Sequence, residues 1–395
     1  MNQNVLTQDQ TNMKLSNLTT IFHLLYDHAP ISRADLAKLS GMSPTSITRF
    51  VTNMQAVNLV SETPSTQKKV GRTATMLNIN ESAIFSVGIN IDATHTHVSI
   101  LNFRQEFVAD RYVHVCVDSP SLEYILDTAY DLYQKALADA GLSDSQICGI
   151  GVSVTGPISR SSILEFTPQL KWKGINIREA VQKRFKHQCV IVENDCNSSL
   201  LGQCVLHPEY KKYDVACICI GSGVGSSIAY RGALFTQPTG ISFSEIGHTT
   251  VDPNGMICDC GNRGCLQTYL AENSLILRAQ QSDPSIRTMD DLYRAWNMGV
   301  PWARELLHLA CTYGRIAINN VACVYNPQIV LICGTSIDNY WDMFAELVTT
   351  PPSYFEPLKG KIQIIPFFKI YHSSILGVSQ QVQEQYLNAL LESTL

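Results

Sequence analysis

Residues 32–54, SRADLAKLSGMSPTSITRFVTNM, contain two short helical patterns separated by a turn of about three residues. Ser32 is a preferred N-cap for the first helix, and the glycine at position 41 is suited to end it. Ser43 is a good cap for the second helix, with Pro44 at its first position. Two short helices joined in this way are typical of a helix-turn-helix.

The second helix presents a small polar face that suits contact with DNA. Its apolar residues recur at helical spacing and form the opposite, buried face. Small polar side chains with one arginine are suited to reading base edges in a major groove. We therefore predict DNA contacts from Ser43, Thr45, Ser46, Thr48 and Arg49.

The segment after these helices has the pattern of a β-hairpin wing. Two strand-like runs flank a polar loop within residues 59–80, LVSETPSTQKKVGRTATMLNIN. The loop carries Lys68, Lys69 and Arg72, which we expect to contact phosphates or to enter the minor groove. Residues 1–80 are thus predicted to form a winged helix-turn-helix DNA-binding domain. An ordinary helical bundle with a solvated loop is the alternative.

The charge distribution agrees with a polyanionic partner for the N-terminal region. Residues 1–80 contain 7 Lys or Arg and 4 Asp or Glu, a net charge of +3. The remaining residues contain 22 and 30, a net charge of −8, so the whole chain carries −5. The basic end of the chain is where a nucleic acid would bind.

The composition predicts a globular, cytoplasmic protein of two or three domains. The chain has 395 residues, of which 45% are hydrophobic and 16% charged, and these can bury large cores. No apolar run reaches the roughly 18 residues that span a bilayer, and the N-terminus is too polar for a secretory signal, so we predict no membrane insertion. Thirteen cysteines in such a chain favour reduced thiols and metal ligation over disulfides.

From residue 83 onward the pattern changes to alternating strands and helices. Three strand-like runs, 83–91, 97–102 and 112–117, precede a helix over 121–140. A second series of strands follows, with helices near 268–280, 303–325 and 338–349. This pattern predicts an α/β fold with two lobes, 83–200 and 201–373, and a cleft between them. The last segment, 374–395, has an amphipathic helical pattern, and we expect it to pack back on the first lobe.

Residues 247–269, GHTTVDPNGMICDCGNRGCLQTY, gather one histidine and three cysteines in a short segment. Glycines at positions 261 and 264 allow the backbone to turn sharply between the last two cysteines. Four thiolate and imidazole ligands suit a tetrahedral Zn²⁺ ion with no coordination site left for water. We predict one structural zinc ion per chain, bound by His248, Cys258, Cys260 and Cys265. Unrelated buried cysteines are the alternative.

Two carboxylate motifs are expected at the cleft. Asn194 and Asp195 follow a strand and begin a predicted helix, where the helix dipole favours a carboxylate that faces a cleft. Asp195 could act as a general base, hold a hydroxyl group or cap the helix. Glu245 lies three residues before His248, and a metal-bound imidazole leaves its second nitrogen free to bond a hydroxyl group.

Several motifs together resemble the ROK family (repressors, open reading frames, sugar kinases), and in particular its repressor branch. The resemblance covers nearly the whole chain. It implies an actin/hexokinase-like (ribonuclease H-like) fold for the two lobes, and the four zinc ligands match those of the family. The motifs are the helix-turn-helix segment quoted above, GVSVTGPI at 151–158, VENDCN at 192–197, EIGHTTVDPNG at 245–255 and CDCGNRGC at 258–265.

The resemblance also implies a set of sugar contacts. In the family these come from a Gly-Pro turn, an Asn-Asp pair, the Glu and His of an ExGH motif, and a Glu after the last zinc cysteine. Here Gln267 stands in place of that last Glu, and Gln169 stands where the family has Asn. Both amides keep hydrogen bonding but alter charge or reach, so the resemblance does not imply which sugar is bound. The implied sugar-binding residues are Gly156, Asn194, Asp195, Glu245, His248 and Gln267.

Residues 90–95 depart from the kinase branch of the family. Where ROK kinases have DIGGTK, this chain reads NIDATH, with Asn90 for the acidic residue that helps to hold Mg²⁺ and Asp92 for a glycine. The Asp92 carboxylate would repel the phosphates of ATP. We therefore predict that the chain is not an enzyme and has no catalytic residues, although Asp195 corresponds to the family's catalytic base.

These features predict a sugar-responsive DNA-binding regulator, a repressor of genes for carbohydrate uptake and catabolism. The expected partners are operator DNA, a sugar or sugar phosphate in the cleft, and further copies of the chain in a homodimer or homotetramer. The ligand would shift the equilibrium between DNA-compatible and incompatible arrangements. The alternatives are a repressor controlled by a membrane sugar-transporter protein, and an ATP-dependent sugar kinase with a DNA-binding domain.

Overall fold

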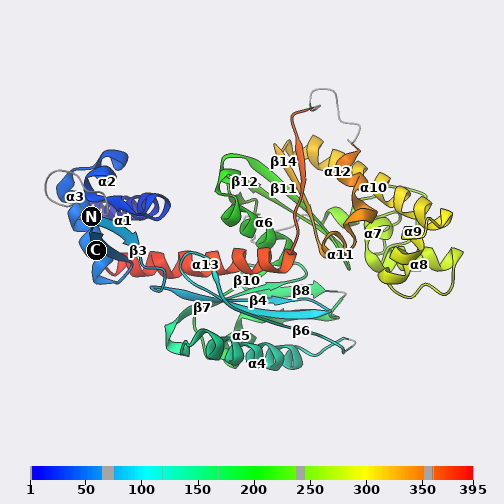
Figure 1. Ribbon diagram of the computed structural model, residues 1–395, viewed down its shortest axis with the longest axis horizontal. Coiled ribbons are helices and arrows are strands. Elements are labelled where there is room, and N and C mark those ends of the chain that lie inside the picture. Colours follow the sequence, from blue (N-terminus) through cyan, green and yellow to red (C-terminus); the bar gives the residue numbers. More distant parts are fainter. Residues whose placement is uncertain are drawn as a thin grey trace.

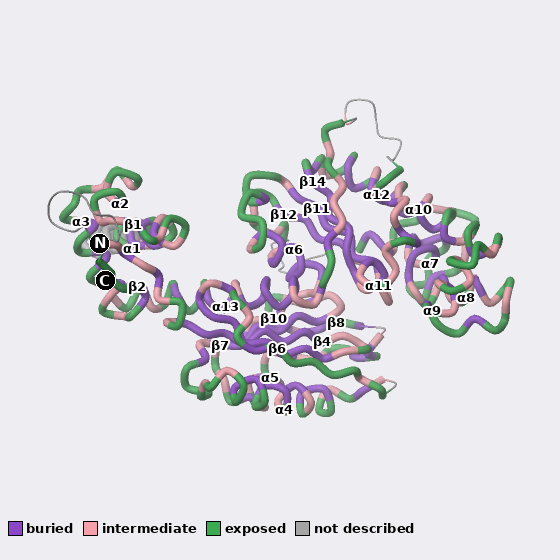
Figure 2. The backbone as a smooth tube through the Cα atoms, viewed as in Figure 1, coloured by how far each residue is buried: buried purple, intermediate pink, exposed green. Residues whose placement is uncertain are grey.

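The computed structural model describes residues 2–64, 75–117, 119–167, 169–236, 245–350, 358 and 360–394, with side chains described from Met13 onward. A small N-terminal domain lies at one end of an elongated molecule, beside two larger lobes (Figure 1). One long helix, α13 (Ile370–Glu392), runs from between the lobes to the N-terminal domain. Each of the three bodies has its own buried apolar core, and buried residues follow the two sheets and α13 (Figure 2).

The N-terminal domain packs three helices against a three-stranded antiparallel sheet of order β1-β3-β2. The Ser32 hydroxyl accepts a hydrogen bond from the Asp35 amide, and the Ser43 hydroxyl from the Ser46 amide, so both predicted N-caps are present. Gly41 adopts the left-handed conformation that ends α2. The elements are α1 (Asn2–His28), β1 (Ile31–Ser32), α2 (Arg33–Ser40), α3 (Pro44–Ala56), β2 (Val60–Pro64) and β3 (Thr75–Ile79).

The first lobe is a five-stranded sheet of order β10-β7-β4-β5-β6. Its central strand β4 pairs antiparallel with β5 and parallel with β7. Helices α4 and α5 cover one face of the sheet, and α13 covers the other (Figure 1). The elements are β4 (Phe85–Ile91), β5 (His95–Leu101), β6 (Phe107–His114), α4 (Leu122–Ala140), β7 (Ile147–Val154), the hairpin β8 (Ile163–Thr167) and β9 (Trp172–Asn176), α5 (Ile177–Phe185) and β10 (Val190–Asn194).

The second lobe repeats this sheet plan in the order β13-β12-β11-β14-β15. Its central strand β11 again pairs antiparallel with one neighbour and parallel with the other. Two similar α/β lobes were predicted from the two series of strands. The elements are α6 (Asp195–Leu206), β11 (Asp214–Ile220), β12 (Val224–Tyr230), β13 (Ala233–Leu234), α7 (Gln267–Leu270), α8 (Glu272–Ser282), α9 (Met289–Asn297), α10 (Pro301–Tyr325), β14 (Ile329–Cys333), α11 (Thr335–Phe344), α12 (Glu346–Thr349) and β15 (Gln363–Pro366).

Some elements differ from the sequence prediction. The third strand of the first lobe, β6, begins at Phe107, five residues before the predicted start at Tyr112. It is an edge strand with mostly exposed side chains, so its residues lack a strong apolar pattern. The C-terminal helix begins at Ile370 and not at residue 374, and helix α9, which has only 9 residues, was not predicted.

Helix α13 touches helix α6 backbone to backbone between the lobes. A Cβ atom on Gly202 of α6 would lie 1.8 Å from the carbonyl oxygen of Ser373, and one on Gly377 of α13 would lie 1.9 Å from the carbonyl oxygen of Ser198. Only glycine permits this approach. The two helices therefore form one closely packed pair that links the lobes.

The other end of α13 belongs to the N-terminal domain. Leu387 and Leu391 are buried in the core formed by the three N-terminal helices and their sheet. Beyond the helix, the carbonyl oxygen of Thr394 accepts a hydrogen bond of 3.0 Å from the Asn53 side chain of α3. One continuous helix thus begins between the lobes and ends in the core of the N-terminal domain.

None of the helices in the described ranges is long and apolar enough to span a bilayer.

The close contact between α6 and α13 predicts that Gly377→Ala destabilises the protein. Alanine is the better helix former by about 1 kcal/mol, but its methyl group has no space here, so we expect a net loss of about 1–3 kcal/mol. Urea denaturation measures this change. The matched control is Gln385→Ala, at an exposed position of the same helix, which should stay within about 0.5 kcal/mol of the parent. A Gly377→Ala protein at least as stable as the parent would contradict the packing described.

Candidate functional site: a cavity between the lobes and an adjoining metal-ligand group

A cavity of about 400 Å³ lies between the two lobes and contains every residue of the implied sugar site. Its volume lies in the range of pockets for small molecules. Most of its wall comes from strand ends and the loops that follow them, together with the first turns of α6 and α13. The residues of the implied sugar site that line it are Gly156, Asn194, Asp195, Glu245, His248 and Gln267.

Asn194 joins the helix start to the cavity wall. It is the N-cap of α6, and its side-chain oxygen accepts hydrogen bonds from the amides of Cys196 and Asn197. Its side-chain nitrogen donates to the carbonyl oxygen of Gly156 at 3.0 Å. Gly156 has a φ of 115°, and a Cβ there would lie 2.7 Å from the carbonyl oxygen of Phe166. Only glycine therefore fits at this turn.

Asp195 is placed beside Thr155 by the parallel pairing of β10 with β7. Because Val154 lies opposite Asn194 in the register, the residues that follow these two strands meet at one sheet edge. The Thr155 hydroxyl donates a hydrogen bond of 3.0 Å to the Asp195 carboxylate. Burial raises the pKa of Asp195 to about 6, and the Thr155 hydrogen bond opposes part of that shift.

Glu245 is the N-cap and His248 the last residue of the short helix Ile246–His248, and both line the cavity. The Nε2 atom of His248 is 4.0 Å from the Glu245 carboxylate. Burial raises the pKa of Glu245, and the nearby His248 ring lowers it in part. The other ring nitrogen, Nδ1, lies 3.7 Å from the Cys258 sulfur. His248 thus connects the cavity with the group of cysteines.

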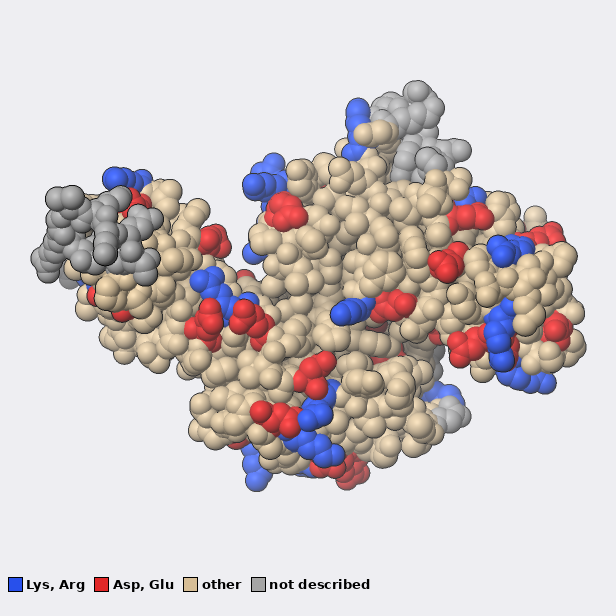
Figure 3. Space-filling view, in the orientation of Figure 1, with Lys and Arg blue, Asp and Glu red and all other residues tan. Residues whose placement is uncertain are grey.

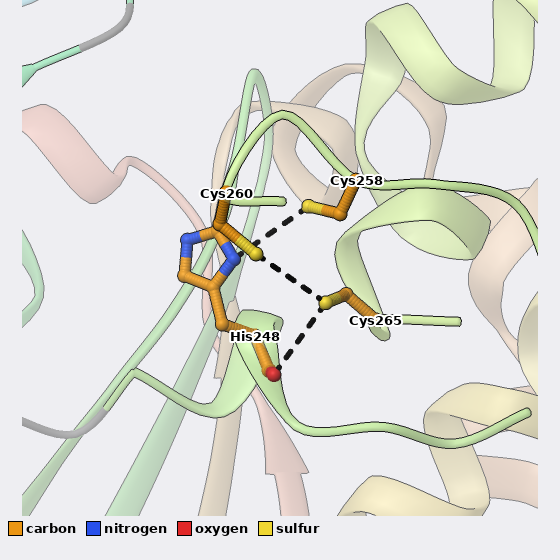
Figure 4. A group of neighbouring side chains, drawn as sticks. All are labelled: His248, Cys258, Cys260 and Cys265. Carbon is orange, nitrogen blue, oxygen red and sulfur yellow. Dashed lines mark hydrogen bonds between the residues drawn. The ribbon is translucent and has the colours of Figure 1, made fainter. Parts of the chain in front are cut away.

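His248, Cys258, Cys260 and Cys265 converge as expected for a metal site (Figure 4). Their ligand atoms all lie within 4.8 Å of one another, and the sulfurs of Cys260 and Cys265 are 3.6 Å apart. Three sulfurs and one imidazole nitrogen are the donor set of a closed tetrahedral site. The predicted ligands are therefore brought together in a geometry compatible with one bound metal ion.

The chain turns tightly around this group because of Gly264. Its φ is 68°, and a Cβ there would lie 1.5 Å from the carbonyl oxygen of Asp252. The Asp252 carboxylate is held in turn by hydrogen bonds from the hydroxyl groups of Tyr269 and Tyr313, at 2.5 and 3.3 Å. The loop that carries three of the four ligands is thus anchored to helices α7 and α10.

The two glutamines that depart from the family pattern lie on the cavity wall. Gln169 and Gln267 both approach Gly223. Gln169 accepts a hydrogen bond of 3.1 Å from the Thr167 hydroxyl. Two neutral amides therefore occupy this part of the wall, and either can donate to or accept from a ligand hydroxyl group.

The segment that departs from the kinase pattern also lines the cavity. The Asn90 amide nitrogen donates to the hydroxyl groups of Ser374 on α13 and Ser153 on β7, at 3.0 and 3.3 Å. Asp92 accepts hydrogen bonds from the amide and hydroxyl of Thr94, and its carboxylate remains on the cavity wall. Asn90 thus forms a structural contact with α13 at the position where a kinase has an acidic residue.

Sequence reasoning missed several residues of the cavity. Thr155 lies 40 positions before its partner Asp195, and only the pairing of consecutive parallel strands indicates that they meet. Thr335 and Tyr371 line the wall, and no local motif marks them. Thr335 donates to the carboxylate of Glu272, whose pKa is raised by burial.

The predicted DNA-contact face of α3 is largely exposed. Ser43, Thr45, Thr48 and Arg49 are exposed and Ser46 is partly buried. Ser43 also caps the helix by accepting a hydrogen bond from the Ser46 amide. On the face of the molecule in Figure 3, basic and acidic side chains are interspersed over both lobes. The predicted wing residues Lys68, Lys69 and Arg72 lie outside the described residues.

Comparison with known proteins identifies relatives over nearly the full length. A family model described as the ROK family matches residues 86–373. The xylose repressor of Bacillus subtilis is 25% identical over 383 residues, which cover 97% of this chain and 98% of that protein. The sequence likeness therefore includes both the lobes and the N-terminal domain.

Two solved structures show the same fold. A ROK family transcriptional regulator, a homolog of the Escherichia coli MLC protein, matches with a TM-score of 0.79 and 21% identity over 96% of this chain and 99% of its own. The ROK family glucokinase from Streptomyces griseus, solved with glucose and AMPPNP, matches with a TM-score of 0.65 and 19% identity over 76% of this chain and 99% of its own. These matches confirm the hexokinase-like fold of the two lobes.

The raised pKa of Asp195 predicts a pH-dependent loss of stability. Because its pKa in the folded protein, about 6, lies above the ordinary value of 3.8, the folded state binds an extra proton between these values and loses stability as the pH rises through that window. Asp195→Asn should remove this loss and stabilise the protein at pH 7.5 by about 1–3 kcal/mol.

Chemical denaturation of both proteins between about pH 4 and 8 measures this difference. Thr155→Val removes the hydrogen bond that lowers the pKa of Asp195, so that pKa should rise further. The variant should therefore lose stability over a wider pH range than the parent does. A stability difference between the parent and Asp195→Asn that does not change with pH would show that the carboxyl group is not perturbed in this way.

Proposed function

Because the chain belongs to the ROK family, we propose that it is a sugar-responsive transcriptional repressor whose effector binds in the cavity between the lobes. The observation that carries the proposal is the connection of two sites by α13. The N-terminal end of α13 lines the cavity through Ile370, Tyr371 and Ser374. The last turns of the same helix lie in the N-terminal core. The full-length likeness to a protein named as a xylose repressor supports the same function.

The N-terminal domain is the proposed DNA-binding module. Helices α2 and α3 with the intervening turn have the arrangement of a helix-turn-helix, and β2 and β3 are the two strands of a wing. Helix α3 would enter the major groove with its exposed face, on which Arg49 is the only cation among the described residues. A homodimer would present two such helices to the two halves of an operator.

The charges of the cavity favour a neutral sugar over a sugar phosphate. Its wall carries the carboxylates of Asp92, Asp195, Glu245 and Asp259, and no lysine or arginine occurs among the described residues that line it. Carboxylates and amides can accept hydrogen bonds from several sugar hydroxyl groups, but they repel a phosphate group. The same repulsion acts on ATP, so the proposed function includes no kinase reaction.

We assign a structural zinc ion to His248, Cys258, Cys260 and Cys265. The donor set of three sulfurs and one imidazole suits Zn²⁺ and leaves no position for water. A bound ion would fix the His248 ring through Nδ1, so that Nε2 faces Glu245 and the cavity. Metal analysis of the purified protein should give one zinc ion per chain.

Helix α13 is the proposed route from effector to DNA. A sugar that closes the lobes on each other would shift α6 and α13 together, since they touch at Gly202 and Gly377. That shift reaches the N-terminal core through Leu387 and Leu391. To weaken DNA binding 100-fold, the sugar must prefer the released state by about 2.7 kcal/mol. A transporter protein that binds the outer surface would use the same route without a sugar in the cavity.

Operator release by neutral sugars tests the proposal. DNA that the protein selects from a random pool is labelled, and its affinity is measured by fluorescence anisotropy with D-xylose, D-glucose or D-glucose 6-phosphate. We expect at least one neutral sugar to weaken DNA binding ten-fold or more, and the phosphate to have no effect. Glu245→Gln should lose the response and keep DNA binding, because a carboxylate acceptor is removed from the cavity alone.

Arg49→Ala is the matched control, because it lies on α3 far from the cavity wall. It should lose DNA affinity and still bind the sugar in a thermal-shift assay. Weaker DNA binding in the presence of glucose 6-phosphate, but not of a neutral sugar, would contradict the proposed effector class. DNA binding that no small molecule alters would instead favour control by a protein partner.

A further inference from the structure

A second group of sulfurs lies apart from the four predicted zinc ligands. The Cys217 and Cys219 sulfurs are 3.8 Å apart, Cys217 and Cys333 are 3.4 Å apart, and Cys219 and Cys333 are 3.0 Å apart. Cys217 and Cys333 are fully buried, and Cys219 is 7% exposed. Three thiols thus meet at one point in the core of the second lobe.

The sheet register places these sulfurs together. Cys217 and Cys219 are two residues apart on β11 and therefore project from the same face. Cys333 ends the neighbouring parallel strand β14 and lies directly opposite Cys219. The three ligand atoms lie within 4.8 Å of one another, as do those of the predicted zinc site. Their common position follows from the backbone and needs no rearrangement.

No histidine, aspartate or glutamate among the described residues adds a ligand atom to this group. The core around it contains Leu200, Val215, Leu331 and Ile370. Cys196, in the first turn of α6, packs in the same core.

We propose that Cys217, Cys219 and Cys333 bind one copper(I) ion in a three-coordinate site made only of sulfur. Copper(I) is a soft ion that prefers thiolates. Zinc would need a fourth donor. The Cys196 sulfur contacts that of Cys219, but among the described residues only Cys217, Cys219 and Cys333 have sulfurs here that all lie within 4.8 Å of one another. Each coordinating thiol releases its proton when the ion binds. The predicted zinc site, which includes an imidazole nitrogen, has a different donor set.

The ion would join the two strands whose ends form part of the sugar cavity. Cys219 itself lines the cavity, as do Gly221 after β11 and Thr335 after Cys333. A metal bridge between β11 and β14 would therefore stiffen this wall. The proposal concerns a second metal site and does not depend on the sugar or DNA proposals.

Copper(I) binding to the reduced full-length chain tests the site. The zinc-loaded protein is incubated without oxygen with copper(I) that is buffered by a chromophoric chelator. The protein is then desalted, and its copper and zinc contents are measured. The parent should retain one copper per chain and keep its zinc. Cys217→Ser and Cys333→Ser should each retain at least ten-fold less copper. The matched control is Cys311→Ser, a buried cysteine outside the group, which should bind copper like the parent.

If the serine variants fail to fold, X-ray absorption spectroscopy of the copper-loaded parent identifies the atoms that coordinate the copper ion. Three sulfur neighbours and no nitrogen neighbour are expected, whereas copper in the predicted zinc site would show an imidazole nitrogen. The proposal is overturned if the parent retains no copper, if it gains copper only as it loses zinc, or if a folded Cys333→Ser variant binds copper as the parent does.

Discussion

The backbone contact between α6 and α13 is the constraint on which the rest of the structure depends. Because Gly202 and Gly377 have no side chains, the two helices approach each other closely between the lobes. Helix α6 begins at the cavity with Asn194 and Asp195, and α13 begins there with Ile370 and continues to the N-terminal core. In the proposed mechanism, a change at the cavity would therefore reach the N-terminal domain through packed helices and not through a loop.

In the proposed function, the cavity of a kinase-like fold serves as a sensor. Asn90 bonds to Ser374 of α13, so the segment that would hold a nucleotide in a kinase here supports the connecting helix. The carboxylates of Asp195 and Glu245 remain at the cavity, where they can hold hydroxyl groups. We propose that this site holds sugar hydroxyl groups without the phosphate contacts that a kinase needs, so that it would bind a sugar and not phosphorylate it.

Local patterns predicted much of the fold and of the site. The caps Ser32 and Ser43, the spacing of His248 with the three cysteines, and the strand-to-helix step at Asn194 are encoded within a few residues, and the structure contains each of them. The family resemblance, which rested on such motifs, is confirmed by the matching family model. Its implied sugar contacts are gathered at one cavity, and sugar binding itself remains a prediction.

The remaining features depend on residues far apart in the chain. The Thr155–Asp195 bond and the group of Cys217, Cys219 and Cys333 arise from the pairing of parallel strands, which no short pattern specifies. The edge strand β6 was placed too late because few of its side chains are buried. The insertion of α13 into the N-terminal core likewise depends on tertiary packing and not on its own periodicity.

The most direct test of the connection through α13 is the sugar-induced change in operator affinity of Leu387→Ala. The cavity is untouched in this variant, so sugar affinity should stay at the parent value while the ratio of DNA affinities without and with sugar falls several-fold. Leu36→Ala, in the same core but on α2, is the matched control and should keep the parent ratio. An unchanged ratio in a folded Leu387→Ala protein would show that the signal does not travel through α13.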